Sequence, residues 1–83
     1  SRADDLVPPR NPAEQRLANI WADVLAQKQV GIHNNFFELG GHSLLATQVI
    51  SRLREEFQVE LPLRSLFEAP TVADLAQWIE QVQ

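Results

Sequence analysis

The sequence contains no cysteine, and its 83 residues include only two histidines and three glycines. Without cysteine the chain can form no disulfide framework, no thiolate metal site and no cysteine nucleophile. The two histidines, His33 and His42, make a poor zinc site when no cysteine accompanies them. We therefore expect no bound metal and no chemistry that depends on a thiol of the chain itself.

Positive charge and long apolar runs are also scarce. The 7 basic residues are outnumbered by 11 acidic residues, so the net charge is −4. Nucleic-acid binders are usually basic, and an acidic chain is not attracted to anionic membranes. No apolar run approaches the ~18 residues of a transmembrane helix, and no signal-peptide pattern opens the sequence. We expect a cytoplasmic domain, monomeric in isolation, that binds neither nucleic acid nor membrane.

The length and composition fit one small globular domain, because 45% of the residues are hydrophobic and 22% are charged. Residues 1–10 include the pair Pro8-Pro9 and offer little to bury. An extended, proline-containing segment suits a tether between domains. We predict that residues 1–10 are a linker or tail and that residues 11–83 form the domain.

A first helix is predicted over residues 12–27. Asn11 can cap it, Pro12 suits the first helical position, and Glu14 follows the cap by three residues. Apolar residues then recur with the helical period and form one buried stripe. The stripe comprises Leu17, Ile20, Trp21, Val24 and Leu25. Its place in the stripe favours core packing over ligand binding for Trp21.

Three more helices are predicted, over residues 43–57, 63–68 and 72–81. Pro62 and Pro70 separate them, and Thr71 can cap the last one. No segment alternates convincingly as a strand does, so the predicted fold is all-α. It is a small bundle of three main helices and one short helix. The long loop of residues 28–42 should be pinned to the core by its apolar residues, which are Val30, Ile32, Phe36, Phe37 and Leu39.

Residues 36–44 read Phe-Phe-Glu-Leu-Gly-Gly-His-Ser-Leu and lead into the second helix. Glycines permit a tight approach, so the pair Gly40-Gly41 should deliver Ser43 to the start of that helix. Two interpretations of Ser43 follow. It is an ordinary N-cap, or it presents its hydroxyl for modification by an anionic group, which a helix N-terminus favours. Leu44 lies roughly 175° from the centre of the predicted core face at ~100° per residue.

No catalytic constellation emerges from the sequence. A G-x-S-x-G nucleophile elbow needs glycine at position 45, where this chain has Leu45, and it needs a preceding strand. His42 and Ser43 are neighbours in sequence, and neighbours do not generally point at each other, which disfavours a catalytic triad. The Gly-Gly pair lacks the lysine and the spacing of a phosphate-binding loop. We predict a substrate or carrier rather than an enzyme.

Residues 36–44 resemble the core motif of peptidyl carrier (thiolation) domains of nonribosomal peptide synthetases. Residues 9–12, 61–63 and 67–72 resemble further landmarks of the same family, so the likeness covers almost the whole chain. The resemblance implies an acyl-carrier-protein-like fold and a role in antibiotic-type biosynthesis. Ser43 would be esterified by the 4′-phosphopantetheine of coenzyme A, through a magnesium-dependent phosphopantetheinyl transferase. The arm would hold aminoacyl or peptidyl thioesters and deliver them to adenylation, condensation and thioesterase-type domains.

The resemblance also assigns roles to the neighbours of Ser43. Gly40 and Gly41 would shape the loop, and His42 and Leu44 would contact partners. Two positions depart from the family pattern: Asn34 replaces a frequent aspartate, and Gln58 replaces the glycine or asparagine that often ends the second helix. If Gln58 is left-handed, strain of ~1 kcal/mol follows.

Three other functions compete with this interpretation. A helical interaction module would use Ser43 only as a cap, and a hydrolase would use His42 with Ser43. A carrier of fatty or polyketide acyl chains would usually show Asp-Ser-Leu, which this chain lacks. The sequence identifies neither the amino acid carried nor the final product.

Overall fold

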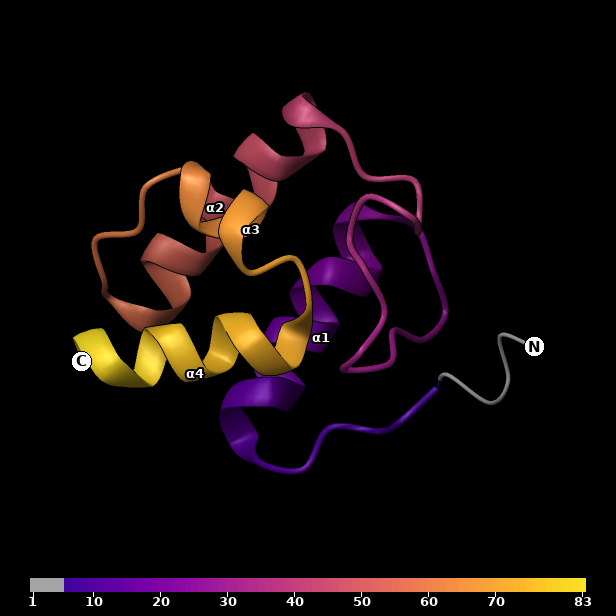
Figure 1. The fold of residues 1–83 in the computed structure, drawn as a ribbon, viewed down its shortest axis with the longest axis horizontal. Coiled ribbons are helices and arrows are strands. Elements are labelled where there is room, and N and C mark those ends of the chain that lie inside the picture. The colour runs from indigo at the N-terminus through magenta and orange to yellow at the C-terminus, as the bar shows by residue number, and fades with distance from the viewer. Residues whose placement is uncertain (1–5) are drawn as a thin grey trace.

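The computed structural model describes residues 6–83, and this part of the chain contains four α-helices and no strand. In chain order the helices are α1 (Pro12–Val24), α2 (Ser43–Phe57), α3 (Arg64–Glu68) and α4 (Val72–Val82). Figure 1 shows α3 as a short element between α2 and α4, and the long loop on the side away from the C-terminus. The predicted all-α fold, with three main helices and one short one, is confirmed.

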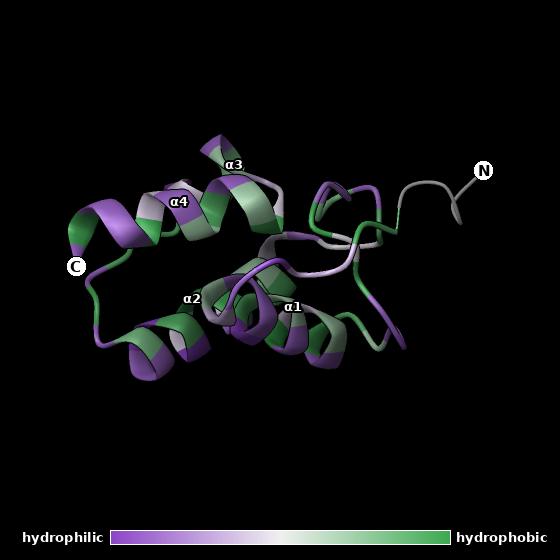
Figure 2. Ribbon diagram, turned by 90° about the horizontal axis from the view of Figure 1, so that it is seen from below, coloured by the Kyte–Doolittle hydropathy of each residue, from purple (hydrophilic) through white to green (hydrophobic). Residues whose placement is uncertain are grey.

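The helices form two layers around one core. In Figure 2, α3 and α4 lie on one side, and α1 and α2 lie on the other. Helix α1 contacts both α2 and α4, so it is the central element of the packing. The largest fully buried side chains come from the helices and also from the loop; they are Trp21, Phe36, Leu17, Ile32, Leu53, Leu61, Leu66, Leu75 and Ile79.

Helix α1 begins as predicted and ends earlier than predicted. The Asn11 side chain accepts a hydrogen bond from the Glu14 N–H at 2.9 Å, and Pro12 is the first helical residue. The predicted end at residue 27 was wrong, because Ala26 adopts a left-handed conformation with φ 54°. The N–H groups of Ala26 and Gln27 bond back to Asp23 O and Ala22 O, which closes the helix as a Schellman motif without glycine.

Helix α2 spans the predicted residues, and its core face is close to the predicted arc. Ala46, Val49, Ile50, Leu53 and Phe57 are buried, whereas Leu45 is half-buried. Two further boundaries differ from the prediction by one residue. Helix α3 begins at Arg64 rather than at residue 63, and α4 ends at Val82 rather than at residue 81. The predicted cap of α4 is confirmed, since Thr71 Oγ1 accepts from the Asp74 N–H at 3.2 Å.

Gln58 ends α2 in the left-handed conformation, with φ 54° and ψ 47°. We expect Gln58→Gly to raise the free energy of unfolding by up to ~1 kcal/mol, because glycine reaches this region without steric cost. The Gln58 side chain donates to Glu55 O at 2.6 Å, and losing this bond reduces the gain. Ala26→Gly is the matched control, since it relieves similar strain at φ 54° without removing a side-chain bond. Urea unfolding of the three proteins measures both changes, and a loss of stability in both variants would contradict the strain argument.

The loop before α2 is held against the helices by backbone hydrogen bonds. The Phe36 N–H donates to Pro70 O at 2.8 Å, and the Ala73 N–H donates to Ile32 O at 3.0 Å. Asn34 Oδ1 accepts from the Gly31 N–H at 2.8 Å, so asparagine at this position still caps the turn. Val30, Ile32 and Phe36 are buried, as predicted for a pinned loop.

Residues 1–5 of the predicted linker lie outside the described residues. Residues 6–10, which we call the N-terminal strap, lie against the domain. Val7 is half-buried on the core, and Val7 O accepts from the Ile32 N–H at 3.0 Å. The strap therefore buries more than the sequence indicated.

Candidate functional site at the start of helix α2

Ser43 is the first residue of α2 and does not cap it. The N-cap position belongs to His42, whose backbone is extended at φ −147° and whose side chain makes no capping bond. The interpretation of Ser43 as an ordinary N-cap was therefore wrong by one position. Ser43 is exposed, and within residues 6–83 its hydroxyl has no hydrogen-bond partner; only its carbonyl is engaged, by Thr47 Oγ1 at 3.0 Å.

The start of α2 has backbone N–H groups that lack hydrogen-bond acceptors. The first bond into the helix runs from the Ala46 N–H to His42 O at 2.8 Å. The N–H groups of Ser43, Leu44 and Leu45 precede it and donate to no group in the described part of the chain. The first turn contains no acidic side chain. These donors and the helix dipole favour an anionic group attached at this end of α2.

The two glycines before Ser43 are required for different reasons. Gly40 has φ +104°, where a side chain would be strained although the surrounding space is open. Gly41 has no room for a Cβ, which would overlap the Phe36 ring and lie 2.7 Å from Phe36 O. The Gly41 N–H also donates to Phe36 O at 3.0 Å. The backbone thus turns tightly over Phe36 on its way to Ser43.

Phe36 connects this turn to the core and to the surface through a series of ring contacts. Its ring lies 5.1 Å from that of Trp21 and 5.2 Å from that of Phe37, both edge to face. Phe37 in turn stacks on Phe67 of α3 at 5.0 Å. Trp21 and Phe36 are fully buried, so core packing is confirmed for both. The loop that delivers Ser43 is therefore fixed by aromatic packing.

Sequence reasoning did not single out Phe67, which is 48% exposed and lies against the loop. No signal in the sequence marked it, because Leu66 and Phe67 are adjacent apolar residues of a helix too short to show a periodic pattern; only the structure shows that Leu66 is buried and Phe67 is not. Leu44, at 65%, is the most exposed of the large apolar side chains, as the helical arithmetic predicted. His42 is also exposed.

The described residues bring together no cluster of three or more histidine or acidic side chains that could hold a metal ion. His33, the other histidine, lies on the surface in the preceding loop. No helix among residues 6–83 is long and apolar enough to cross a membrane.

Comparison with known proteins identifies the family. Residues 15–79 match the family model described as the phosphopantetheine attachment site. The chain is 65% identical over 71 residues to one of the linear gramicidin synthase subunits of Brevibacillus parabrevis. It is 46% identical over 78 residues to surfactin synthase subunit 3 of Bacillus subtilis strain 168. These matches cover 86% and 94% of this chain, but only 1% and 6% of the two synthase subunits.

The fold is shared with a solved carrier structure. The peptidyl carrier protein in complex with a phosphopantetheine transferase and coenzyme A is 47% identical, with a TM-score of 0.87. The alignment covers 90% of this chain and 97% of that one. The donor-rich helix start and the exposed serine also suit a phosphopantetheine group. The chain belongs to the phosphopantetheine attachment family, as a peptidyl carrier domain of the nonribosomal peptide synthetase type.

Proposed function

We propose that Ser43 is the residue to which 4′-phosphopantetheine is attached. The observation that carries the proposal is the exposed Ser43 hydroxyl, which has no partner among residues 6–83 and stands at an uncapped helix N-terminus. In the reaction the Ser43 oxygen bonds to the β-phosphorus of coenzyme A. The bond from that phosphorus to the adenosine bisphosphate breaks, and the serine proton goes to a base of the transferase. The product phosphodiester is an anion beside the free N–H groups of α2.

The domain carries intermediates and performs no chemistry of its own. Within the described residues Ser43 has no hydrogen-bonded base, so it cannot act as an activated nucleophile without a partner enzyme. The arm holds an aminoacyl or peptidyl group as a thioester, and adenylation, condensation and thioesterase-type domains act on it. We place the domain in the cytoplasm, which supplies the coenzyme A and magnesium that the transferase uses, and as a monomer when isolated.

The residues around Ser43 have two further roles, shaping the turn and contacting partner domains. Gly40 and Gly41 shape the turn, and His42 and Leu44 contact partners. The partner-contact role of Leu44 is supported by its exposed apolar side chain, which lies one residue from Ser43. The first three exposed residues after it on α2, Thr47, Gln48 and Ser51, are uncharged, which suits docking of several different domains. We place the carrier domain at residues 11–83 and the connection to a preceding domain at residues 1–10.

The class of cargo is tested on the modified domain. The domain is loaded from coenzyme A and then offered an amino acid with ATP and an adenylation domain of a related synthetase, or an acyl chain with a fatty-acid-activating enzyme. Acylation by the amino acid alone, released by hydroxylamine as expected for a thioester, supports a peptidyl carrier. Acylation by the fatty acyl chain alone would instead assign the domain to fatty or polyketide synthesis.

A further inference from the structure

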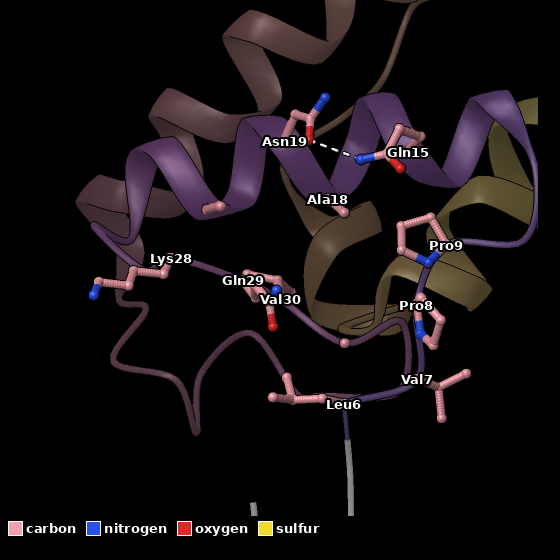
Figure 3. A pocket seen from close by; sticks show the side chains of 12 residues that line it. Leu6, Val7, Pro8, Pro9, Gln15, Ala18, Asn19, Lys28, Gln29 and Val30 are labelled. Carbon is pink, nitrogen blue, oxygen red and sulfur yellow. Dashed lines mark hydrogen bonds between the residues drawn. The ribbon is translucent and has the colours of Figure 1, made fainter. Parts of the chain in front are cut away.

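The N-terminal strap is attached to the domain at two separate points. The first is the hydrogen bond from the Ile32 N–H to Val7 O at 3.0 Å. The second is the pairing of Arg10 with Glu14, the third residue of α1. Between them the strap spans a groove of about 260 Å³, which Figure 3 shows between residues 6–9, α1 and residues 28–30. Because of this groove the strap is held by its two ends rather than by continuous packing.

The Arg10–Glu14 pairing is more complete than the other described ion pairs. Glu14 Oε1 accepts from the Arg10 N–H at 2.8 Å and from Arg10 Nε at 3.1 Å, and Oε2 accepts from Nη2 at 2.7 Å. The Glu14 side chain is only 3% exposed, whereas the Arg10 side chain is 59% exposed. By contrast, both partners of the Arg52–Asp23 pair are exposed, at 46% and 70%. A carboxylate removed from water needs such donors, since an unpaired buried charge is costly.

The strap also contacts a segment that leads to Ser43. Ile32 donates to Val7 O, and its own carbonyl accepts from the Ala73 N–H of α4 at 3.0 Å. Ile32 is fully buried and lies in the loop between α1 and α2. One residue of that loop thus joins the strap to α4.

We propose that Arg10 and Glu14 form a latch that holds residues 6–10 on the domain and so removes these residues from the tether to a preceding domain. This inference extends the proposed function, because it assumes that another domain precedes the carrier. Opening the latch would release five residues, which at ~3.4 Å per residue adds about 17 Å of reach. The latch thereby sets how far Ser43 and its arm can travel from a preceding domain.

Protonation of Glu14 would open the latch. Hydrogen bonds from the Arg10 side chain lower the pKa of Glu14, against the raising effect of burial. The charged and titratable groups that act on Glu14 are Arg10 and, more weakly, His33. Because the folded pKa lies below the unfolded one, the stabilisation is present above the unfolded pKa. It is lost as the pH falls through the folded pKa.

The test is the hydrogen-exchange protection of the Ile32 amide, measured by NMR on the complete 83-residue chain. In Arg10→Ala we expect Ile32 protection to fall about tenfold or more while amides inside α2 keep theirs, as expected for local opening. Arg52→Ala is the matched control, because it removes an arginine from an exposed pair, and it should leave Ile32 unchanged. In acid, Ile32 protection should fall in the native chain, whereas in Glu14→Gln it should already be low at neutral pH.

Two results would overturn the latch. Unchanged Ile32 protection in Arg10→Ala would mean that the Val7 contact alone holds the strap. An equal fall of protection at Ile32 and in α2 would mean that the ion pair stabilises the whole fold rather than the strap. Neither measurement uses coenzyme A or a transferase, so failure of the latch is distinguishable from failure of the proposed attachment at Ser43.

Discussion

Ser43→Ala is expected to abolish attachment of phosphopantetheine and to leave the stability of the domain unchanged. The hydroxyl is the proposed nucleophile, and alanine has no atom that can replace it. The stability should hold within about ±0.5 kcal/mol, the range of ordinary surface substitutions. The structure gives the reason: Ser43 is exposed and is not the N-cap of α2. A capping serine would instead cost about 1 kcal/mol when replaced by alanine.

The experiment combines two measurements on the same proteins. A fluorescent coenzyme A derivative with a broad-specificity transferase reports attachment, and thermal unfolding reports stability. Ser51→Ala is the matched control, because Ser51 is an exposed serine of the same helix, and it should be labelled like the native chain. Labelling of Ser43→Ala would refute the assignment of the site. A loss of stability near 1 kcal/mol together with normal labelling would return the role of a cap to Ser43.

Gly41→Ala adds one methyl group and should lower the stability of the domain more than any other single added methyl group near the site. The added Cβ would overlap the ring of Phe36 and lie 2.7 Å from its carbonyl oxygen. Phe36 cannot move aside easily, because it is fully buried and packs edge to face on Trp21 at 5.1 Å. Overpacking of this kind costs roughly 1–3 kcal/mol. In a domain of this size that is a fall of roughly 5–20 °C in the midpoint of thermal unfolding.

A double variant tests whether the loss of stability in Gly41→Ala comes from the clash with Phe36 or from a general sensitivity of the loop to substitution. Phe36→Leu should be destabilising alone, because it removes buried ring contacts, but it also removes the ring that the new Cβ overlaps and leaves only the approach to the carbonyl oxygen of residue 36 at 2.7 Å. The loss in Gly41→Ala/Phe36→Leu should therefore be smaller than the sum of the two single losses. Gly40→Ala serves as the comparison, because it meets no neighbouring atom and should suffer only the backbone strain of φ +104°. Additive losses in the double variant would contradict the proposed clash.

The parts of the fold that could be predicted are those with a strong local signal. The boundaries of α2 follow from Gly40-Gly41 before it and from a continuous core face, and Asn11 and Thr71 mark the starts of α1 and α4. The early end of α1 had no such signal. Ala26 is a good helix former, and its residue type does not indicate that it adopts a left-handed conformation.

The site was predictable in its chemistry but less so in its geometry. The sequence places Ser43 at the start of a helix, but a shift of one residue separates a capping serine from a presented one. That shift depends on the extended backbone of His42, which no residue type dictates. The strap was missed for a related reason. The single residue Val7 and a pairing of Arg10 with Glu14 are too sparse to form a periodic pattern, although they fix the segment in space.

Attachment of phosphopantetheine to Ser43 is tested by the intact mass of the native chain before and after incubation with coenzyme A, magnesium and a broad-specificity phosphopantetheinyl transferase. We expect a gain of one phosphopantetheinyl group, localised to Ser43 by fragmentation of the peptide that contains it. If the mass is unchanged while the domain is folded and the transferase modifies another carrier in the same mixture, Ser43 is not an attachment site.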